Sequence, residues 1–322
     1  MIQLRIYDSP AECRAIWEQC WPRRNLFDLW QARLCFAAAY NRQPHFLVAE
    51  EGKNIKGLLA LSWVEEEQAF MHFPGETWKG KTWLEQNRIP ASSTHVFREL
   101  MSCIPRPAHL RYLVSDSVPI GEESVAVDEV GYLFFPGKYA YSFQSYFQLF
   151  SKKSRKKMTR ELDKLAKPGA TYRYNQLGDI DWIYKTNIEN FQQDSYFHDS
   201  RFLSAVEKLV AWLHKQGHLR VTTLLIGGSI AAVDIGAVWN KTYTLLAGAT
   251  NPLFPGAAKM INFHHLEWAC RTRMNEVDFL CGDFRWKQRF HLSPRPLYEL
   301  RMPTENIFCP KNETFHEYAG RL

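Results

Sequence analysis

Apolar residues in the first 140 positions recur with spacings that predict two helices followed by a sheet. Residues 10–20 and 25–40 have helical spacing, and the second segment carries a broad apolar stripe. The strand-like runs 45–50 and 55–63 are separated by a polar turn that is typical of a hairpin. The other elements predicted in this part are strands at 69–73, 110–115 and 130–135 and a helix at 92–104.

The rest of the chain shows the same order of elements with a clearer pattern. Helices are predicted at residues 179–193 and 201–216. A meander of three strands follows, with a two-glycine turn between its first two strands, at residues 219–226, 229–239 and 242–249. A helix at residues 257–274 and a short buried strand at 276–281 come next.

Two landmarks occupy the same place in both parts. A hairpin ends at Trp63 and another at Trp239, and each is followed by a Phe-Pro-Gly sequence, at residues 73–75 and 254–256. An amphipathic helix begins after the second Phe-Pro-Gly but not after the first. We therefore predict an α/β protein with two similar halves, and chance similarity between two meanders is the alternative.

Length and composition are those of a globular protein with two packed cores. The chain has 322 residues, of which 46% are hydrophobic and 23% charged. The N-terminus lacks a secretory pattern and no apolar run is long enough to cross a bilayer, which predicts a cytoplasmic protein. The seven cysteines include no Cys-x-x-Cys pair and lie mostly among apolar residues. We expect reduced thiols and no metal site.

The positive charge of the chain is concentrated in one segment. Residues 151–167 contain eight basic and two acidic residues, a net of 8 − 2 = +6, which equals the formal charge of the whole chain. Apolar residues at helical spacing make this segment an amphipathic helix with a cationic outer face. Its basic residues could hold the phosphates of a small donor, an acidic acyl carrier protein or a tRNA backbone. A solvated helix that links two domains is the alternative.

The connection between the strand at 242–249 and the helix at 257–274 is a candidate anion site. Its small residues let a ligand approach the backbone, and the first turn of the helix has N–H groups without intrahelical acceptors. A plain strand-to-helix connection is the alternative reading. The candidate residues for binding a donor pyrophosphate are Thr250, Asn251, Gly256, Ala257, Ala258 and Lys259.

Several motifs in this part occur in an order that resembles a known family. They include the basic run 154–160, the Leu224-Leu-Ile-Gly-Gly228 turn, the Pro255-Gly256 helix start and the run Val277-Asp-Phe-Leu-Cys-Gly-Asp283 before Trp286 and Lys287. Together they resemble the acyltransferase domain of the GNAT superfamily, in the branch of the cellulose-biosynthesis protein CelD and, more distantly, the Fem-type aminoacyl ligases. The resemblance covers residues 151–290. It departs from the family at Trp286, where a tyrosine is usual.

The resemblance implies a GNAT fold in which the strands at 242–249 and 277–280 separate, so that the pantetheine arm of an acyl-CoA enters between them. Such enzymes position an amine against a thioester and remove a proton from it. Asp234, inside an apolar strand, is the candidate general base, with a solvent-facing aspartate as the alternative. The other catalytic candidates are Asp278 and Asp283 to orient the acceptor, Lys287 to bind an anionic group and Tyr243 to protonate the leaving thiolate.

Each of these candidates also has a structural interpretation. Asp283 could cap a helix, Lys287 could be an ordinary solvated lysine, and Tyr243 could be an aromatic residue of the core. His264 and His265 are more typical of structural histidines.

The expected domains are a degenerate GNAT-like domain at 1–141, a basic linker helix at 142–170, a catalytic GNAT domain at 171–302 and a tail at 303–322. The expected function is N-acyl transfer from acyl-CoA, or from acyl carrier protein, to an amine on a small molecule, sugar or lipid precursor. The alternatives are a Fem-like ligase that uses aminoacyl-tRNA and a non-catalytic binding module.

Overall fold

The computed structural model describes residues 2–117, 125–282 and 285–303. The first part of the chain forms β1 (Gln3–Tyr7), α1 (Pro10–Cys20), α2 (Trp30–Tyr40), β2 (His45–Glu51), β3 (Asn54–Val64), β4 (Ala69–His72), α3 (Thr94–Ser102), β5 (Ala108–Leu113) and β6 (Val125–Phe134). The second part forms α4 (Phe143–Phe147), α5 (Lys152–Ala166), β7 (Ala170–Tyr174), α6 (Ile180–Phe191), α7 (Ser200–Lys215), β8 (Leu219–Ile226), β9 (Ser229–Trp239), β10 (Thr242–Thr250), α8 (Ala257–Arg271), β11 (Glu276–Asp278), α9 (Arg285–Arg289) and β12 (Ser293–Met302).

The strands of the described residues form one mixed sheet of twelve, in the order β1-β2-β3-β4-β5-β12-β6-β11-β10-β9-β8-β7. The two halves of this sheet repeat one pattern, because β4 is parallel to β5 and β10 is parallel to β11. The strand after each parallel pair crosses to the other half, so that β6 pairs with β11 and β12 pairs with β5. β6 and β12 also pair with each other. The two halves are therefore joined by exchanged strands, and their division into separate domains stays a prediction.

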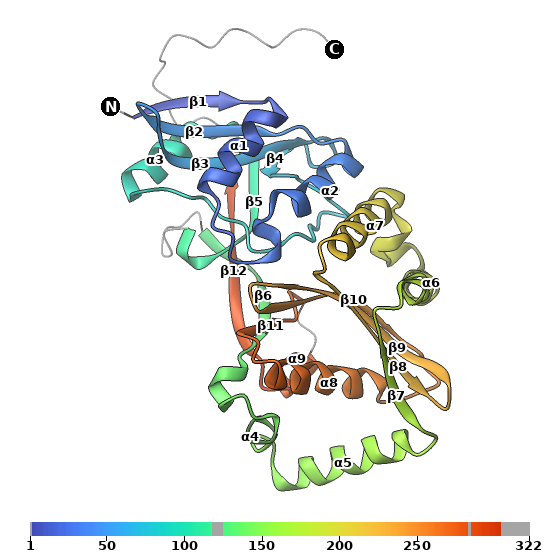
Figure 1. Ribbon diagram of the computed structural model, residues 1–322. Helices are drawn as coiled ribbons and strands as arrows, with labels where there is room; N and C mark the ends of the chain where they lie inside the picture. Colours follow the sequence, from blue (N-terminus) through green and yellow to red (C-terminus); the bar gives the residue numbers. More distant parts are fainter. Residues whose placement is uncertain (1, 118–124, 283–284, 304–322) are drawn as a thin grey trace.

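Helices of the two halves share a hydrophobic core. Phe36 of α2 and Phe202 of α7 pack edge to face with ring centroids 6.0 Å apart, and Val206 and Leu209 of α7 belong to the same cluster. Figure 1 shows α7 beside α2, above the strands β7 to β10. Burial of these apolar side chains between the halves stabilises their relative placement.

Most predicted elements are present near the predicted positions, and the differences have local causes. The predicted helix at 25–40 begins only at Trp30, because Asn25 caps a short 3₁₀ turn, Leu26–Asp28, and Leu29 is extended. The predicted strand at 276–281 is limited to Glu276–Asp278. The pattern missed β1, β7 and β12, and in β12 the prolines 294 and 296 obscure a strand. Both prolines lie where β12 pairs with β6 alone, because pairing with β5 starts at Tyr298.

The basic segment forms α5, an amphipathic helix as predicted. Met158 and Leu162 pack against one apolar cluster and Leu165 against another, while most of the lysine and arginine side chains are exposed. In Figure 1, α5 lies below the sheet, at the far side from α1. Among the helices that the structure describes, none has both the length and the apolar character that crossing a membrane requires.

Candidate active site

The parallel strands β10 and β11 pair over only three residues and then separate. The pairing runs from Thr242 opposite Glu276 to Thr244 opposite Asp278. Beyond this point a cavity of about 560 Å³ is lined by residues 245–250 on one side and residues 279–282 on the other. This separation is the one that the resemblance implied, and the volume lies in the range of small-molecule sites.

A bulge in β10 lies at the same point. The register with β9 shifts between Leu245 and Ala247, so that Leu246 is an extra residue without a partner across the ladder. A bulge changes the local direction of the backbone and of the side chains, and this bulge borders the cavity. Asn187 of α6, which also lines the cavity, donates a hydrogen bond of 3.2 Å to the carbonyl of Gly248. The wall of the cavity is therefore tied to α6.

The first half of the chain also lines the cavity, which the sequence did not predict. Four of its six lining residues come from the connection between β4 and α3, and the full set is Lys81, Thr82, Trp83, Glu85, Tyr112 and Glu129. This connection spans residues 73–93 and contains no helix or long strand. Long non-periodic connections inside a compact fold are frequently functional, which is the signal that could have identified it.

Glu85 is the most unusual of these residues. Its side chain is buried, and its Oε1 accepts a hydrogen bond of 2.6 Å from the backbone N–H of Cys281. Its Oε2 is buried without a hydrogen-bond partner among the described residues, although Arg295 Nη2 lies 3.7 Å away. Burial and the nearby charge of Asp278 raise the pKa of Glu85 to about 7.

Asp278, a predicted catalytic residue, is fully buried beneath the cavity and does not line it. Its Oδ2 accepts hydrogen bonds from Arg295 Nη1 at 3.0 Å and from Gln86 Nε2 at 2.7 Å. Its Oδ1 accepts the N–H of Leu280 at 2.8 Å. These contacts connect β11, the exchanged strand β12 and the first half, so Asp278 holds the floor of the site together.

Asp234, the predicted base, lines the cavity on the side of α8. Its Oδ2 lies 2.9 Å from Nε2 of the fully buried His265. Tyr243 is fully buried next to this pair, with its ring 5.2 Å from that of His265, and it does not line the cavity. Burial and the charge of Asp234 raise the pKa of Tyr243. The structure therefore brings Asp234, His265 and Tyr243 together in one buried polar cluster.

Lys287 and Trp286 also line the cavity. The Nζ atom of Lys287 donates hydrogen bonds of 2.8–2.9 Å to the carbonyls of Phe279, Leu280 and Cys281. These bonds fix the backbone at the end of β11, where the cavity opens. The predicted site residue Asp283 and the predicted tail from residue 304 onwards lie outside the described residues.

The predicted anion site lies at the start of α8. Gly256 is the N-cap residue, with a φ of 102° that other residues rarely adopt. Thr250 and Ala258 line the cavity, whereas Ala257 is buried in the core and Asn251 caps its own turn. No acidic residue is present in the first turn of the helix.

The charge of Lys259 is already paired. Its Nζ lies 2.7 Å from Glu161 of α5, which also approaches Lys157 at 3.8 Å. The α5 side chain Leu165 lies under the start of α8, 3.6 Å from where a Cβ of Gly256 would be. The basic helix therefore lies directly beside the predicted anion site.

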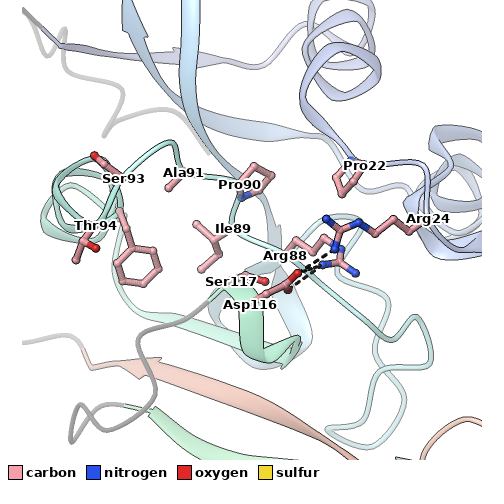
Figure 2. Close-up of a pocket in the computed structure, with 11 residues that line it drawn as sticks. Pro22, Arg24, Arg88, Ile89, Pro90, Ala91, Ser93, Thr94, Asp116 and Ser117 are labelled. Atoms are coloured by element: carbon pink, nitrogen blue, oxygen red, sulfur yellow. Dashed lines mark hydrogen bonds and ion pairs between the residues drawn. The ribbon is translucent and has the colours of Figure 1, made fainter. Parts of the chain in front are cut away.

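A second cavity, of about 400 Å³, lies in the first half near the start of α3 (Figure 2). Its two arginines, Arg24 and Arg88, both point toward Asp116, with N–O distances of 3.0 and 2.9 Å. Arg88 Nε also lies 3.6 Å from the buried Asp28. The cations of this cavity are thus balanced by carboxylates, and it is less suited to an anion than the start of α8.

Comparison with known proteins agrees with this geometry. Residues 152–288, less than half of the chain, match the acetyltransferase (GNAT) domain model. No curated protein sequence matches the chain significantly.

Solved structures match over nearly the whole chain at low identity. A conserved protein of unknown function from Bacteroides thetaiotaomicron has a TM-score of 0.57 and 15% identity, covering 92% of this chain and 98% of that one. FemX has a TM-score of 0.58 and 9% identity, covering 92% and 97%. L-PGS from Bacillus licheniformis has a TM-score of 0.54 and 8% identity, covering 93% and 94%. The match to a GNAT-type acetyltransferase domain thus lies within residues 152–288, while the solved structures support the fold alone.

Proposed function

We propose that this protein is an N-acyltransferase that moves an acyl group from a thioester, of coenzyme A or of an acyl carrier protein, to an amine by direct attack. The observation that carries the proposal is the cavity between β10 and β11. Its lining extends from Thr250 and Ala258, at the start of α8, to Glu85 and Tyr112 of the first half. A donor can thus lie on the α8 side and an acceptor on the side of the first half, with the thioester between the strands.

The start of α8 fits the pyrophosphate of coenzyme A. The first N–H groups of a helix and its dipole favour an anion, and the side chains at positions 257 and 258 are methyl groups that leave room for it. We propose that Thr250, Asn251, Gly256, Ala257, Ala258 and Lys259 surround the donor phosphates.

The cavity also offers polar groups for the acyl transfer. A backbone N–H at the β10 bulge, around Leu246, would stabilise the charge that develops on the carbonyl oxygen. The attacking amine needs a nearby base to take up its proton. Our proposed catalytic residues remain Asp234, Asp278, Asp283, Lys287 and Tyr243. Asp278 and Tyr243 do not line the cavity and Lys287 bonds to backbone carbonyls, so their contacts favour positioning roles for these three. The relationship to the CelD branch, which the sequence motifs suggested, stays a prediction.

Isothermal titration with coenzyme A, acetyl-CoA and lauroyl-CoA tests the donor site. Gly256 is a poor position for a variant because any side chain there strains the backbone. Ala258→Glu instead places a carboxylate at the exposed first turn of α8. There its charge interacts favourably with the helix dipole but repels phosphate. We expect this variant to lose about tenfold or more in affinity, or ~1.4 kcal/mol.

Ala258→Gln is the matched control, since it has the same size without the charge, and it should bind nearly as well as the wild type. Equal affinity of the Glu and Gln variants would contradict the anion site. Failure of the folded wild type to bind any of the three ligands would contradict the proposed donor and favour a non-catalytic module.

The cationic face of α5 favours a second candidate, a macromolecular donor. Seven basic residues along α5 and at its C-cap are exposed: Lys152, Lys153, Lys156, Lys157, Arg160, Lys164 and Lys167. Such a surface fits an acidic acyl carrier protein that delivers a thioester on a phosphopantetheine arm. A Fem-like ligase that uses aminoacyl-tRNA would use the same face.

Replacing Lys153, Lys156 and Arg160 together by glutamine tests this surface. Dissociation constants for an acyl carrier protein and for aminoacyl-tRNA, measured at several salt concentrations, separate the two donors. Weaker binding of only one of them by the variant would identify the donor, and unchanged binding of both would leave α5 as a solvated linker helix.

A further inference from the structure

The first half of the chain places a buried carboxylate, that of Glu85, on the wall of the cavity between β10 and β11. Glu85 belongs to the connection between β4 and α3, yet it bonds to the backbone of Cys281, three residues after β11 ends. The residues that line the cavity around it include two aromatic side chains of the first half, Trp83 and Tyr112. Glu85 is therefore held at the cavity by a contact that joins the two halves.

One oxygen of the Glu85 carboxylate accepts a hydrogen bond, and the other has only an ion-pair contact, with Arg295 Nη2 at 3.7 Å. Cys281 N–H occupies Oε1, whereas Oε2 is buried without a hydrogen-bond partner in the part of the chain that the structure describes. A buried carboxylate oxygen without a donor is costly, and such atoms in native proteins commonly have a functional reason. Glu85 is one of the residues that line the cavity, so its carboxylate belongs to the wall that an incoming amine would meet.

The other carboxylates of the site are less free. Asp234 approaches His265 on the α8 side, where the donor phosphates are proposed to bind. Asp278 accepts four hydrogen bonds beneath the floor and does not line the cavity. Glu129 lines the cavity but is only half-buried. Glu85 alone among these four combines a buried, unbonded oxygen with a place on the wall of the first half.

We propose that Glu85 accepts the proton that the acceptor amine loses when it attacks the thioester. The amine nitrogen forms a bond to the carbonyl carbon, the carbon–sulfur bond breaks, and its electron pair leaves on sulfur as a thiolate. One N–H proton passes to the carboxylate of Glu85 and from there to solvent, and a proton from solvent protonates the thiolate. This role rests on the proposed acyltransferase function and makes the first half part of the catalytic site.

The electrostatic surroundings suit a base that works near neutral pH. Burial and the charge of Asp278 raise the pKa of Glu85, and the positive charge of Arg295 opposes them. A base is active when deprotonated, so turnover should rise as the pH increases through the pKa of Glu85. The titratable and charged groups that face Glu85 are Asp278 on β11, Arg295 on β12, Cys281 and Lys287 beside the cavity, and Tyr112 and Tyr196 on its walls.

Glu85→Gln is the decisive variant because its carbonyl oxygen still accepts the N–H of Cys281. The assay measures thiol release from acetyl-CoA between pH 5.5 and 9, with lysine, putrescine, glucosamine and ethanolamine as amine probes and water as the background acceptor. We expect the variant to lose about 10²–10³-fold in kcat and to lose the acidic limb of the pH profile. Its dissociation constant for coenzyme A should not change.

Two further variants complete the test. Glu85→Asp should keep the acidic limb at a reduced rate, and Glu189→Gln, an exposed change on α6, should match the wild type. Glu85→Gln with the wild-type rate and pH profile would overturn the role of Glu85 while leaving the acyltransferase intact. So would an equal loss at every pH together with weaker coenzyme A binding, which indicates a structural role. A wild type that binds acetyl-CoA but releases no thiol under any condition would contradict both the proposed function and this role.

Discussion

The carboxylate of Asp234 lies directly over Gly248 on the neighbouring strand. A Cβ atom at position 248 would be 1.9 Å from Oδ1 of Asp234, and the two residues are register partners in β9 and β10. Only glycine leaves room for this carboxylate to reach His265.

Gly248→Ala should therefore displace Asp234 from His265 and destabilise the fold by about 2–4 kcal/mol, from overpacking and from a buried polar group left unpaired. Urea unfolding measures this change. Asp234→Ala removes the clash, so the double variant should be clearly more stable than the sum of the single changes predicts. Additive effects would contradict the close contact.

The pair of Asp278 and Arg295 should carry much of the stability of the central strands. Arg295→Leu leaves the buried Asp278 without its cation and should cost about 3–5 kcal/mol of unfolding free energy. Adding Asp278→Asn removes the uncompensated charge and should restore part of the loss. If the Arg295→Leu variant has the same midpoint of urea unfolding as the wild type, the ion pair between Asp278 and Arg295 does not stabilise the fold.

The exchanged strands predict that neither half folds alone. A fragment of residues 142–322 lacks β6, the partner of both β11 and β12, and should show no cooperative unfolding transition. Adding a fragment of residues 1–141, which contains β6, should restore the transition and the far-ultraviolet circular dichroism. Cooperative unfolding of the 142–322 fragment by itself would support two independent domains.

The ion pair between Glu161 and Lys259 should weaken donor binding. Glu161→Gln releases Lys259 and Lys157, so the affinity for coenzyme A should rise a few-fold at low salt. Asp163→Asn on the same helix changes the net charge equally and serves as the control. Titrations at two salt concentrations check this, because the gain should shrink at high salt. Equal gains in both variants would indicate a general charge effect.

Local sequence patterns predicted the elements that carry their own signals. The apolar periodicity of residues 201–216 and the alternation around the glycine turn at Gly227 and Gly228 depend on neighbours close in the chain. The same is true of the cationic face of α5 and of the helix that begins after Gly256. These features allowed the GNAT-like half and the position of the candidate donor site to be predicted.

The tertiary structure alone decided what the first half contributes. The sequence gives no sign that β6 and β12 exchange, because strand pairing depends on contacts between residues far apart in the chain. Prolines 294 and 296 concealed β12, and Glu85 stands in a connection without periodicity. Glu85 and Cys281 are 196 positions apart, and only the folded sheet brings them into contact. A local sequence pattern reflects hydrogen bonding and burial among residues that are close in the chain. A site between two halves depends instead on packing between residues that are far apart in the chain.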